Sequence, residues 1–103
     1  MTIVAIHQPE YLPWLGFFKK MMNSELFVFL DDVQFRKKGW QNRNRIRTNK
    51  GTALLSVPVH AHLYPNINKI VIDNNKNWSS KHKKSILYNY TPAPYFEEFK
   101  NSI

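Results

Sequence analysis

The sequence predicts an α/β domain with a small mixed sheet: a parallel strand–helix–strand unit at its start, a β-hairpin in the middle and C-terminal helices. Three observations carry this prediction. Two short apolar runs, residues 3–6 and 26–30, flank a segment with helical spacing. A turn signal at residues 49–51 joins two strand-like segments. Apolar and aromatic residues recur at helical spacing between residues 78 and 90.

The N-terminal unit follows from the order of its apolar residues. Residues 2–6 are β-branched and apolar, which predicts a buried first strand. The next segment repeats apolar residues at helical spacing and leaves Lys19 and Lys20 outside, which predicts an amphipathic helix. The run at residues 26–30 is continuous, as in a strand covered on both faces. Because the connections are short, we expect the two strands to be parallel neighbours in a right-handed unit.

A polar loop, residues 7–13, joins the first strand to the helix. Pro9 and Pro13 exclude a continuous helix or a central strand between them. In α/β proteins, ligands bind beyond the carboxyl ends of strands and at helix N-termini. Under the parallel topology, His7 and Asp31 both lie at the carboxyl ends of neighbouring strands. This loop is therefore the first candidate for a functional site.

The middle of the chain predicts a hairpin. Residues 41–48 alternate in part, so Arg43, Arg45 and Arg47 would share one face of a strand. Residues 49–51 are Asn-Lys-Gly, a turn sequence, and residues 52–59 form the returning strand. Pro58 indicates an edge position or the end of that strand.

The C-terminal part predicts one more strand and two helices. Residues 67–72 are the strand, and a helix follows to Tyr90, capped by Asn77 or Ser79. Residues 91–94 break it, and residues 95–103 begin another helix with Phe96 and Phe99 on one face. No later segment covers that face, so residues 1–103 are interpreted as one incomplete domain. Burial of the same face in a homodimer is the alternative.

Charge and composition limit the partners. The formal net charge is +8, and residues 36–50 hold seven bases and no acid. Such a block favours an anionic partner: phosphate groups, nucleic acid or an anionic membrane surface. The chain has no cysteine, which excludes disulfides, a thiol nucleophile and cysteine metal sites. No signal peptide and no apolar run of membrane-spanning length is present, so a cytoplasmic location is expected.

Two stretches have a distinctive order of residues. They are His7-Gln8-Pro9-x-Tyr11-Leu12-Pro13-Trp14-x-Gly16-Phe17-Phe18-x-Lys20, and Asp31-Asp32-Val33-Gln34-Phe35 running on to Gly39-Trp40-x-Asn42-Arg43-x-Arg45-Ile46. Together with Val57-Pro58-Val59 and Pro94-Tyr95-Phe96, they resemble the WbqC-like protein family. The resemblance implies a link to bacterial surface-polysaccharide and O-antigen biosynthesis, where some members carry the label of glycine or aminoacyl transferase. Because members are usually longer, it also implies that this chain is the N-terminal part of a longer fold.

The candidate catalytic residues lie at the two strand ends. His7 is a candidate general base, since its unperturbed pKa lies near neutrality; the alternative is a structural His that ties the loop to backbone. Asp31 or Asp32 would orient His7 or bind a metal, unless Asp32 only caps the following turn. No third acid clusters with them in the sequence, so no metal site is predicted. No cofactor can be named from the sequence.

The candidate substrate-binding residues are Gln8, Tyr11, Asn42, Arg43 and Arg45. Gln8 and Tyr11 would position the substrate, and the arginine forks suit phosphate or carboxylate. The neighbouring lysines are interpreted as a solvated face. His60, His62 and His82 match no metal-binding pattern and are interpreted as incidental.

Three functional hypotheses remain open at this point. The first is a group transferase of polysaccharide assembly, whose phosphate-bearing substrate is a nucleotide sugar or an activated acyl or aminoacyl donor. The second is a basic binding module for RNA or another polyanion, because aromatic residues lie between arginines. The third is an inactive gene fragment.

Overall fold

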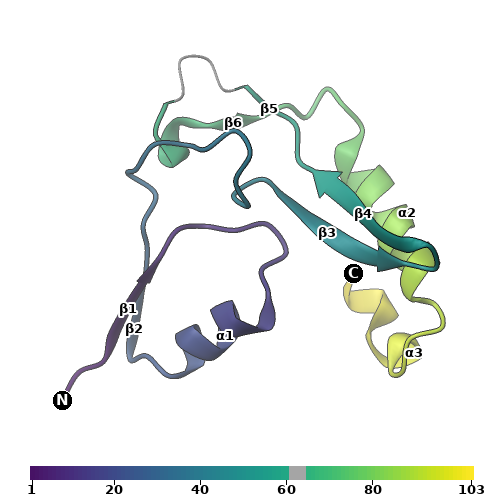
Figure 1. Ribbon diagram of the computed structural model, residues 1–103, viewed down its shortest axis with the longest axis horizontal. Coiled ribbons are helices and arrows are strands. Elements are labelled where there is room, and N and C mark those ends of the chain that lie inside the picture. Colours follow the sequence, from purple (N-terminus) through teal and green to yellow (C-terminus); the bar gives the residue numbers. More distant parts are fainter. Residues whose placement is uncertain (61–64) are drawn as a thin grey trace.

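The computed structural model describes residues 1–60 and 65–103. Its elements in chain order are the strands β1 (Val4–His7), β2 (Leu26–Phe29), β3 (Arg43–Thr48), β4 (Gly51–Ser56), β5 (Val59–His60) and β6 (Val71–Ile72), the helices α1 (Leu15–Met22), α2 (Trp78–Tyr90) and α3 (Phe96–Phe99), and the 3-10 turns η1 (Ile67–Lys69) and η2 (Lys100–Ser102). Figure 1 shows the β1–α1–β2 unit on one side and the β3–β4 hairpin with α2 and α3 on the other. The predicted mixed α/β architecture is confirmed.

The β1–α1–β2 unit has the predicted parallel topology. Val4 pairs with Leu26 and His7 with Phe29, so the carboxyl ends of the two strands meet. The ring of Phe17 on α1 is buried and packs edge-on against Phe27, with 5.4 Å between the ring centroids. α1 ends at Met22, with Asn23 as its C-cap, and two lysines in its last turn complement the negative end of the helix dipole.

The second face of this parallel pair is open, which differs from the sequence expectation. Val4 and Ile6 of β1 and Leu26 and Val28 of β2 are exposed. Strand side chains alternate between faces, and α1 covers only the face that carries Ala5. Within the described residues no second layer packs on the sheet, so the prediction that residues 26–30 are covered on both faces is wrong for this structure.

The hairpin is built around a two-residue turn. Thr48 pairs with Gly51, and Gly51 has φ of 127°, a conformation that disfavours residues with a Cβ. Ile46 and Leu55 are buried on the inner face. α2 runs beside β3 (Figure 1), and the hydroxyl of Tyr90 accepts a 2.9 Å hydrogen bond from the backbone N–H of Arg47. The turn predicted at residues 49–51 is confirmed.

The segment after β2 is held by backbone hydrogen bonds to the residues around η1. The N–H of Phe35 donates to the carbonyl of Pro65, and the N–H of Asn68 donates to the carbonyl of Asp31, both at 2.9 Å. β5 and β6 then form a short antiparallel pair. Phe35, which is buried, lines a pocket together with Val59 of β5 and Ile72 of β6.

The ends of the last helices differ in detail from the prediction. α2 begins at Trp78, but no side chain caps it, so the caps predicted at Asn77 or Ser79 do not form. α3 is one short turn preceded by Tyr95, whose φ of 66° is unusual for a residue with a Cβ. Phe99 stays exposed, as the sequence predicted for one face of this segment.

The described fold is open. The radius of gyration is 15.8 Å, whereas a compact domain of this length has about 13 Å. The buried apolar residues are few and lie in both parts: Ala5, Phe17, Phe35, Ile46, Leu55 and Val57. Among the described residues, no helix is both long and apolar enough to cross a membrane.

Candidate functional site: the loop after the first strand

The loop from His7 to Pro13 leaves the carboxyl end of β1, reaches the hairpin and returns to α1 (Figure 1). The side-chain amide of Asn44 on β3 donates to the carbonyls of Tyr11 and Leu12, at 3.2 and 2.7 Å. The N–H of Tyr11 donates to the carbonyl of Trp40 at 3.1 Å. Leu12 has a φ of 46°, which these bonds help to hold. The hairpin therefore fixes the shape of the loop.

His7 is held between a carboxylate and an ammonium group. Its Nε2 lies 2.9 Å from Oε1 of Glu10, and its Nδ1 lies 3.3 Å from Nζ of Lys20. The same ammonium donates to the carbonyl of Ile6 at 2.8 Å. Because an ammonium group only donates, Nδ1 must accept, and Nε2 then carries the hydrogen that Glu10 accepts. The ring also packs edge-on against Phe17, with centroids 4.8 Å apart, so its orientation is defined from several sides.

Tyr11 connects the loop to α2. Its hydroxyl lies 2.8 Å from Nδ1 of His82, which is buried. The ring of Trp78 packs edge-on against both Tyr11 and His82. Burial raises the pKa of the Tyr11 hydroxyl above its ordinary value of 10.0. At neutral pH this phenol therefore keeps its proton, and its hydrogen bond with His82 orients it.

A second polar link joins the loop to the segment before β3. The amide Nε2 of Gln41 donates to Oε1 of Gln8 at 2.9 Å. The next residue, Asn42, donates through Nδ2 to the carbonyl of Val57 at 2.9 Å. The remaining oxygens, Oε1 of Gln41 and Oδ1 of Asn42, are buried, and among the described residues neither has a hydrogen-bond partner. Such oxygens are uncommon in folded proteins and call for an explanation.

The two predicted arginines lie near one indole ring, that of Trp40. The guanidinium carbons of Arg43 and Arg45 lie 5.9 and 5.6 Å from the centroid of Trp40. Arg43 also donates to the carbonyls of Gly39 and Lys38, at 3.3 and 2.6 Å, so part of its donor set holds the preceding turn. Arg45 is exposed, and its guanidinium makes no hydrogen bond or ion pair within residues 1–60 and 65–103. Arg45 is thus the arginine whose donors are available to a ligand.

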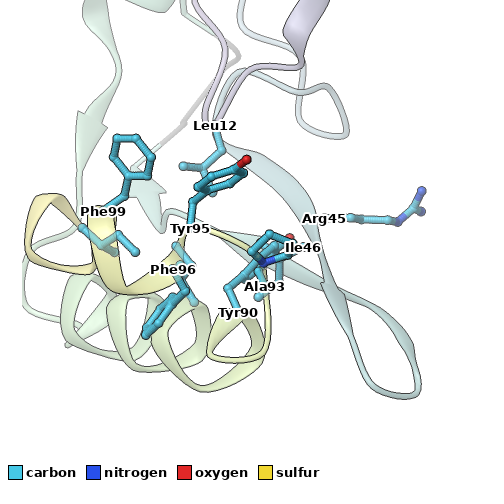
Figure 2. Close-up of a pocket in the computed structure, with 11 residues that line it drawn as sticks. Leu12, Arg45, Ile46, Tyr90, Ala93, Tyr95, Phe96 and Phe99 are labelled. Carbon is cyan, nitrogen blue, oxygen red and sulfur yellow. The ribbon is translucent and has the colours of Figure 1, made fainter.

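Two pockets adjoin this region. One, of about 290 Å³, is lined by Glu10, Tyr11, Phe35, Gln41, Asn42, Val57, Val59, Ile67, Ile70, Ile72 and Trp78. The other, of about 390 Å³, is mostly apolar and lies between the loop, β3 and the C-terminal turns. Figure 2 shows Leu12, Tyr95 and Phe99 around this second space, with Arg45 extending away from it.

The family model of the WbqC-like protein family matches residues 8–103. This chain belongs to the WbqC-like family. It is 36% identical over 100 residues to the uncharacterized protein Rv1507c of Mycobacterium tuberculosis, a match that covers 95% of this chain and 43% of the relative. The chain therefore spans less than half the length of that relative. No solved structure gives a significant match. The resemblance drawn from the two sequence stretches is confirmed.

For this WbqC-like chain, the structure places the predicted residues in three groups. His7, Gln8 and Tyr11 lie together in the loop, and Asn42 lies beside it across the smaller pocket. Arg43 and Arg45 lie around Trp40. Asp31 and Asp32 are exposed beyond β2, and neither carboxylate forms a hydrogen bond with His7 in the described part of the chain.

The carboxylate that does contact His7 was missed at the sequence level. It is Glu10, three residues further along the same loop, and the signal was its position directly after Pro9 in a loop of fixed shape. His82 and Asn44 were missed as well. His82 is four residues after Trp78 on one face of α2, and Asn44 alternates with the arginines on β3. Both are recognisable only when the loop is placed against them.

The remaining histidines lie elsewhere. His60 Nε2 is 3.7 Å from Oδ1 of Asp73 at the end of β6, and His62 falls outside the described residues. Among the residues that the structure describes, no three His, Asp or Glu side chains gather closely enough to hold a metal ion.

Proposed function

We propose that this chain provides the base-bearing part of a group-transfer enzyme of bacterial surface-polysaccharide biosynthesis. The observation that carries the transfer chemistry is the contact of 2.9 Å between His7 and Glu10 at the carboxyl end of β1. The chain belongs to the WbqC-like family. The pathway is proposed from its resemblance to other members of that family.

The His7–Glu10 pair has the arrangement of an oriented general base. Glu10 accepts the Nε2 hydrogen of His7 and fixes its tautomer, so the lone pair of Nδ1 is the basic site. In hydrolases and transferases, a carboxylate holds one imidazole nitrogen while the other nitrogen activates a hydroxyl group; here that other nitrogen, Nδ1, accepts a hydrogen bond from Lys20, which has to be released before Nδ1 takes a proton. In this proposal, Glu10 takes the assisting role for which the sequence suggested Asp31 or Asp32. Those two exposed carboxylates remain candidates for contacts with the acceptor.

The proposed reaction is a displacement at the transferred carbon of the donor. Nδ1 of His7 takes the proton of an acceptor hydroxyl or amine, and the acceptor heteroatom forms a bond to the transferred carbon. The bond from that carbon to a phosphate oxygen breaks, and the phosphate leaves with the electron pair. The ammonium of Lys20 donates to Nδ1 at 3.3 Å in the structure; in this proposal it turns to the acceptor oxygen as Nδ1 takes the proton, and it then supplies positive charge beside that oxygen.

The donor would be a nucleotide sugar or an activated acyl or aminoacyl phosphate. The exposed guanidinium of Arg45 suits its phosphate groups, and Arg43 adds charge near the same indole ring, that of Trp40. Gln8, Tyr11 and Asn42 would position the bound substrate from the loop and the hairpin.

The test is product formation with panels of nucleotide sugars and acyl phosphates and with sugar acceptors, followed by mass spectrometry. We expect His7→Gln to lower the transfer rate by about 10²–10⁴ without lowering the melting temperature. The matched control, His60→Gln, should leave the rate unchanged because, among the described residues, the imidazole of His60 lies beside Asp73 on the β5–β6 pair and not beside the loop. An unchanged rate in His7→Gln would remove His7 from the mechanism. The absence of product and of any donor-induced shift in melting temperature, in this chain and in the mycobacterial relative, would contradict the transferase proposal.

A second candidate function is polyanion binding, which the Arg43–Trp40–Arg45 arrangement favours. The indole of Trp40 is exposed and lies near two guanidinium groups; such a ring can stack on a nucleobase while the arginines bind phosphate. Binding of single-stranded RNA that falls steeply with salt, and that Trp40→Ala weakens, would support this function. Saturable, salt-insensitive binding of one small phosphate compound would count against it.

A further inference from the structure

We infer that a pocket of about 220 Å³ between the end of β4 and the start of α2 is a binding site for a phosphate group, either free or at the end of a small ester. This goes beyond the proposed transfer reaction, which uses Arg43 and Arg45 for the donor phosphates and assigns no role to the residues of this pocket. The inference depends on three features: the charge of the lining, the open start of α2 and one nitrogen of buried His82.

The lining of the pocket is positively charged. Lys76 and Lys81 belong to it and no acid does, so its formal charge is +2. Both lysines are exposed, and neither ammonium group forms a hydrogen bond or an ion pair within residues 1–60 and 65–103. Asp73 lies three positions before Lys76, but it is outside the lining, and its carboxylate accepts a 3.1 Å hydrogen bond from the N–H of Asn75. A phosphate dianion matches two free ammonium groups.

α2 begins at this pocket without a cap. Asn77 occupies the N-cap position, but its side chain makes no capping hydrogen bond, and the first turn of the helix holds no acid. Among the described residues, the backbone N–H groups of Ser79 and Ser80 have no hydrogen-bond partner. Free N–H groups and the positive end of the helix dipole attract an anion to the start of a helix.

His82 distinguishes this helix start from an ordinary one. The residue is only 8% exposed, and it lines the pocket. Its Nδ1 lies 2.8 Å from the hydroxyl of Tyr11, whereas Nε2, across the ring, has no hydrogen-bond partner in the described part of the chain. Because Nδ1 faces Tyr11, Nε2 is the nitrogen left for the pocket. When the hydroxyl donates to Nδ1, Nε2 carries the hydrogen of the neutral imidazole and can donate it to an anion.

A phosphate group suits these donors better than a carboxylate does. Two ammonium groups, two backbone N–H groups and one imidazole nitrogen surround or adjoin the same small space. A phosphate group brings three strong acceptor oxygens and close to two negative charges, whereas a carboxylate brings two oxygens and one charge. The volume of the pocket limits an ester to a small alcohol part.

The test compares four probes: inorganic phosphate, glycerol 3-phosphate, acetate and glycerol. Binding to the 103-residue chain is followed by NMR at mildly alkaline pH and constant ionic strength, through the amide shifts of Ser79 and Ser80 and the imidazole shifts of His82. We expect saturable shifts at millimolar phosphate, with acetate at least about tenfold weaker and glycerol without effect. Tighter binding of the ester would identify a phosphate ester as the ligand, and tighter binding of inorganic phosphate would identify the free ion.

Two pairs of variants locate the site. Lys81→Gln should weaken phosphate binding by about tenfold, whereas Lys83→Gln, an exposed lysine of the same helix outside the lining, should change it little. Asn77→Asp places a carboxylate at the start of the helix and should abolish phosphate binding without lowering the melting temperature. Asn75→Asp adds the same charge at an exposed position outside the lining and should weaken binding less.

Four outcomes would overturn the inference. They are equal binding of acetate and phosphate, equal effects of Lys81→Gln and Lys83→Gln, amide shifts at the helix start without a shift of the His82 imidazole, and no saturable shift with either phosphate probe. Because the readout is phosphate binding by residues outside the transfer site, its failure leaves the His7 transfer proposal untouched. Loss of transfer activity in His7→Gln likewise leaves this site untouched.

Discussion

The β1–α1–β2 unit and the β3–β4 hairpin each place one sheet face against a helix, but their outer faces differ. In the parallel pair, the outer face carries Val4, Ile6 and Leu26, which are 50%, 53% and 55% exposed. In the hairpin, the outer face of β3 carries Arg43 and Arg45, with Arg47 after them.

The comparison shows how the residue pattern differs between parallel and antiparallel strands. An antiparallel hairpin alternates apolar and polar residues because one face meets water, whereas a parallel strand is apolar on both faces because both are normally covered. In this chain the inner face of the hairpin is covered by one helix, α2, and the outer face carries charged residues that suit exposure to water. The parallel pair displays a face whose residue types suit burial, and its stability depends on a few contacts to α1.

The largest expected effect is that of Phe17→Ala. The ring of Phe17 is 4% exposed and packs against His7, Phe27 and Phe29. Its removal should lower the free energy of unfolding by about 3–5 kcal/mol, measured by urea denaturation. Amide hydrogen exchange should show faster exchange in β1 and β2 than in the hairpin. A loss below about 1 kcal/mol would show that the parallel pair does not depend on α1.

Tyr11→Phe should weaken the contact that links the loop after β1 to helix α2, and with it the link between the two regions. The substitution removes the hydroxyl that meets buried His82 and leaves that ring nitrogen unpaired. We expect a loss of about 1–3 kcal/mol in the free energy of unfolding. The control is Tyr88→Phe, since Tyr88 is 77% exposed on the same helix. An equal, small effect of both substitutions would contradict a structural role of the Tyr11–His82 contact.

The pH dependence that Tyr11 gives to the stability of the fold has a definite sign. Because burial raises the pKa of Tyr11 above 10.0, the folded chain holds this proton more tightly than the unfolded chain. The stabilisation is therefore fully present below pH 10.0 and is lost as the pH rises through the higher pKa of the folded state. Unfolding curves of the wild type should show an alkaline loss of stability that is reduced in Tyr11→Phe and retained in Tyr88→Phe.

The elements of the fold were largely predictable, because each depends on local signals. The apolar runs with a short connection gave the parallel pair, and Asn49 to Gly51 gave the hairpin turn. The burial of residues 26–30 was not predictable from their composition. An apolar strand indicates that cover is needed, but not which segment supplies it.

The candidate site was predictable only in part. The loop with His7, Gln8 and Tyr11 follows from its prolines and its place at a strand end, and the motif shared with the family favoured Arg43. The contacts of His82 and Asn44 with the loop join residues far apart in the sequence, so no local pattern reports them. For His7, the topology favoured an acid on the neighbouring strand, whereas the loop itself folds back and supplies Glu10.

Ile46→Val tests the hairpin side of the comparison with a smaller change. Ile46 is buried on the inner face of β3, so the loss of one methyl group should cost about 0.5–1.5 kcal/mol. Ile72→Val, at an exposed strand position, should cost less in the same denaturation experiment. A larger loss of unfolding free energy for Ile72→Val than for Ile46→Val would contradict the assignment of Ile46, rather than Ile72, to the core.

The smallest effect is expected for Val4→Thr on the open face of the parallel pair. Thr keeps the shape and the β-branch of Val, and at an exposed position the change in unfolding free energy should stay within about 0.5 kcal/mol. The matched substitution Val57→Thr buries a hydroxyl at a position that is 5% exposed and should cost about 1–3 kcal/mol. Both are measured by urea denaturation at several protein concentrations. A cost for Val4→Thr as large as that for Val57→Thr, growing with protein concentration, would show that a second copy covers this face. The apolar residues of β1 and β2 would then form an interface between copies, and the contrast with the hairpin would apply to the single chain alone.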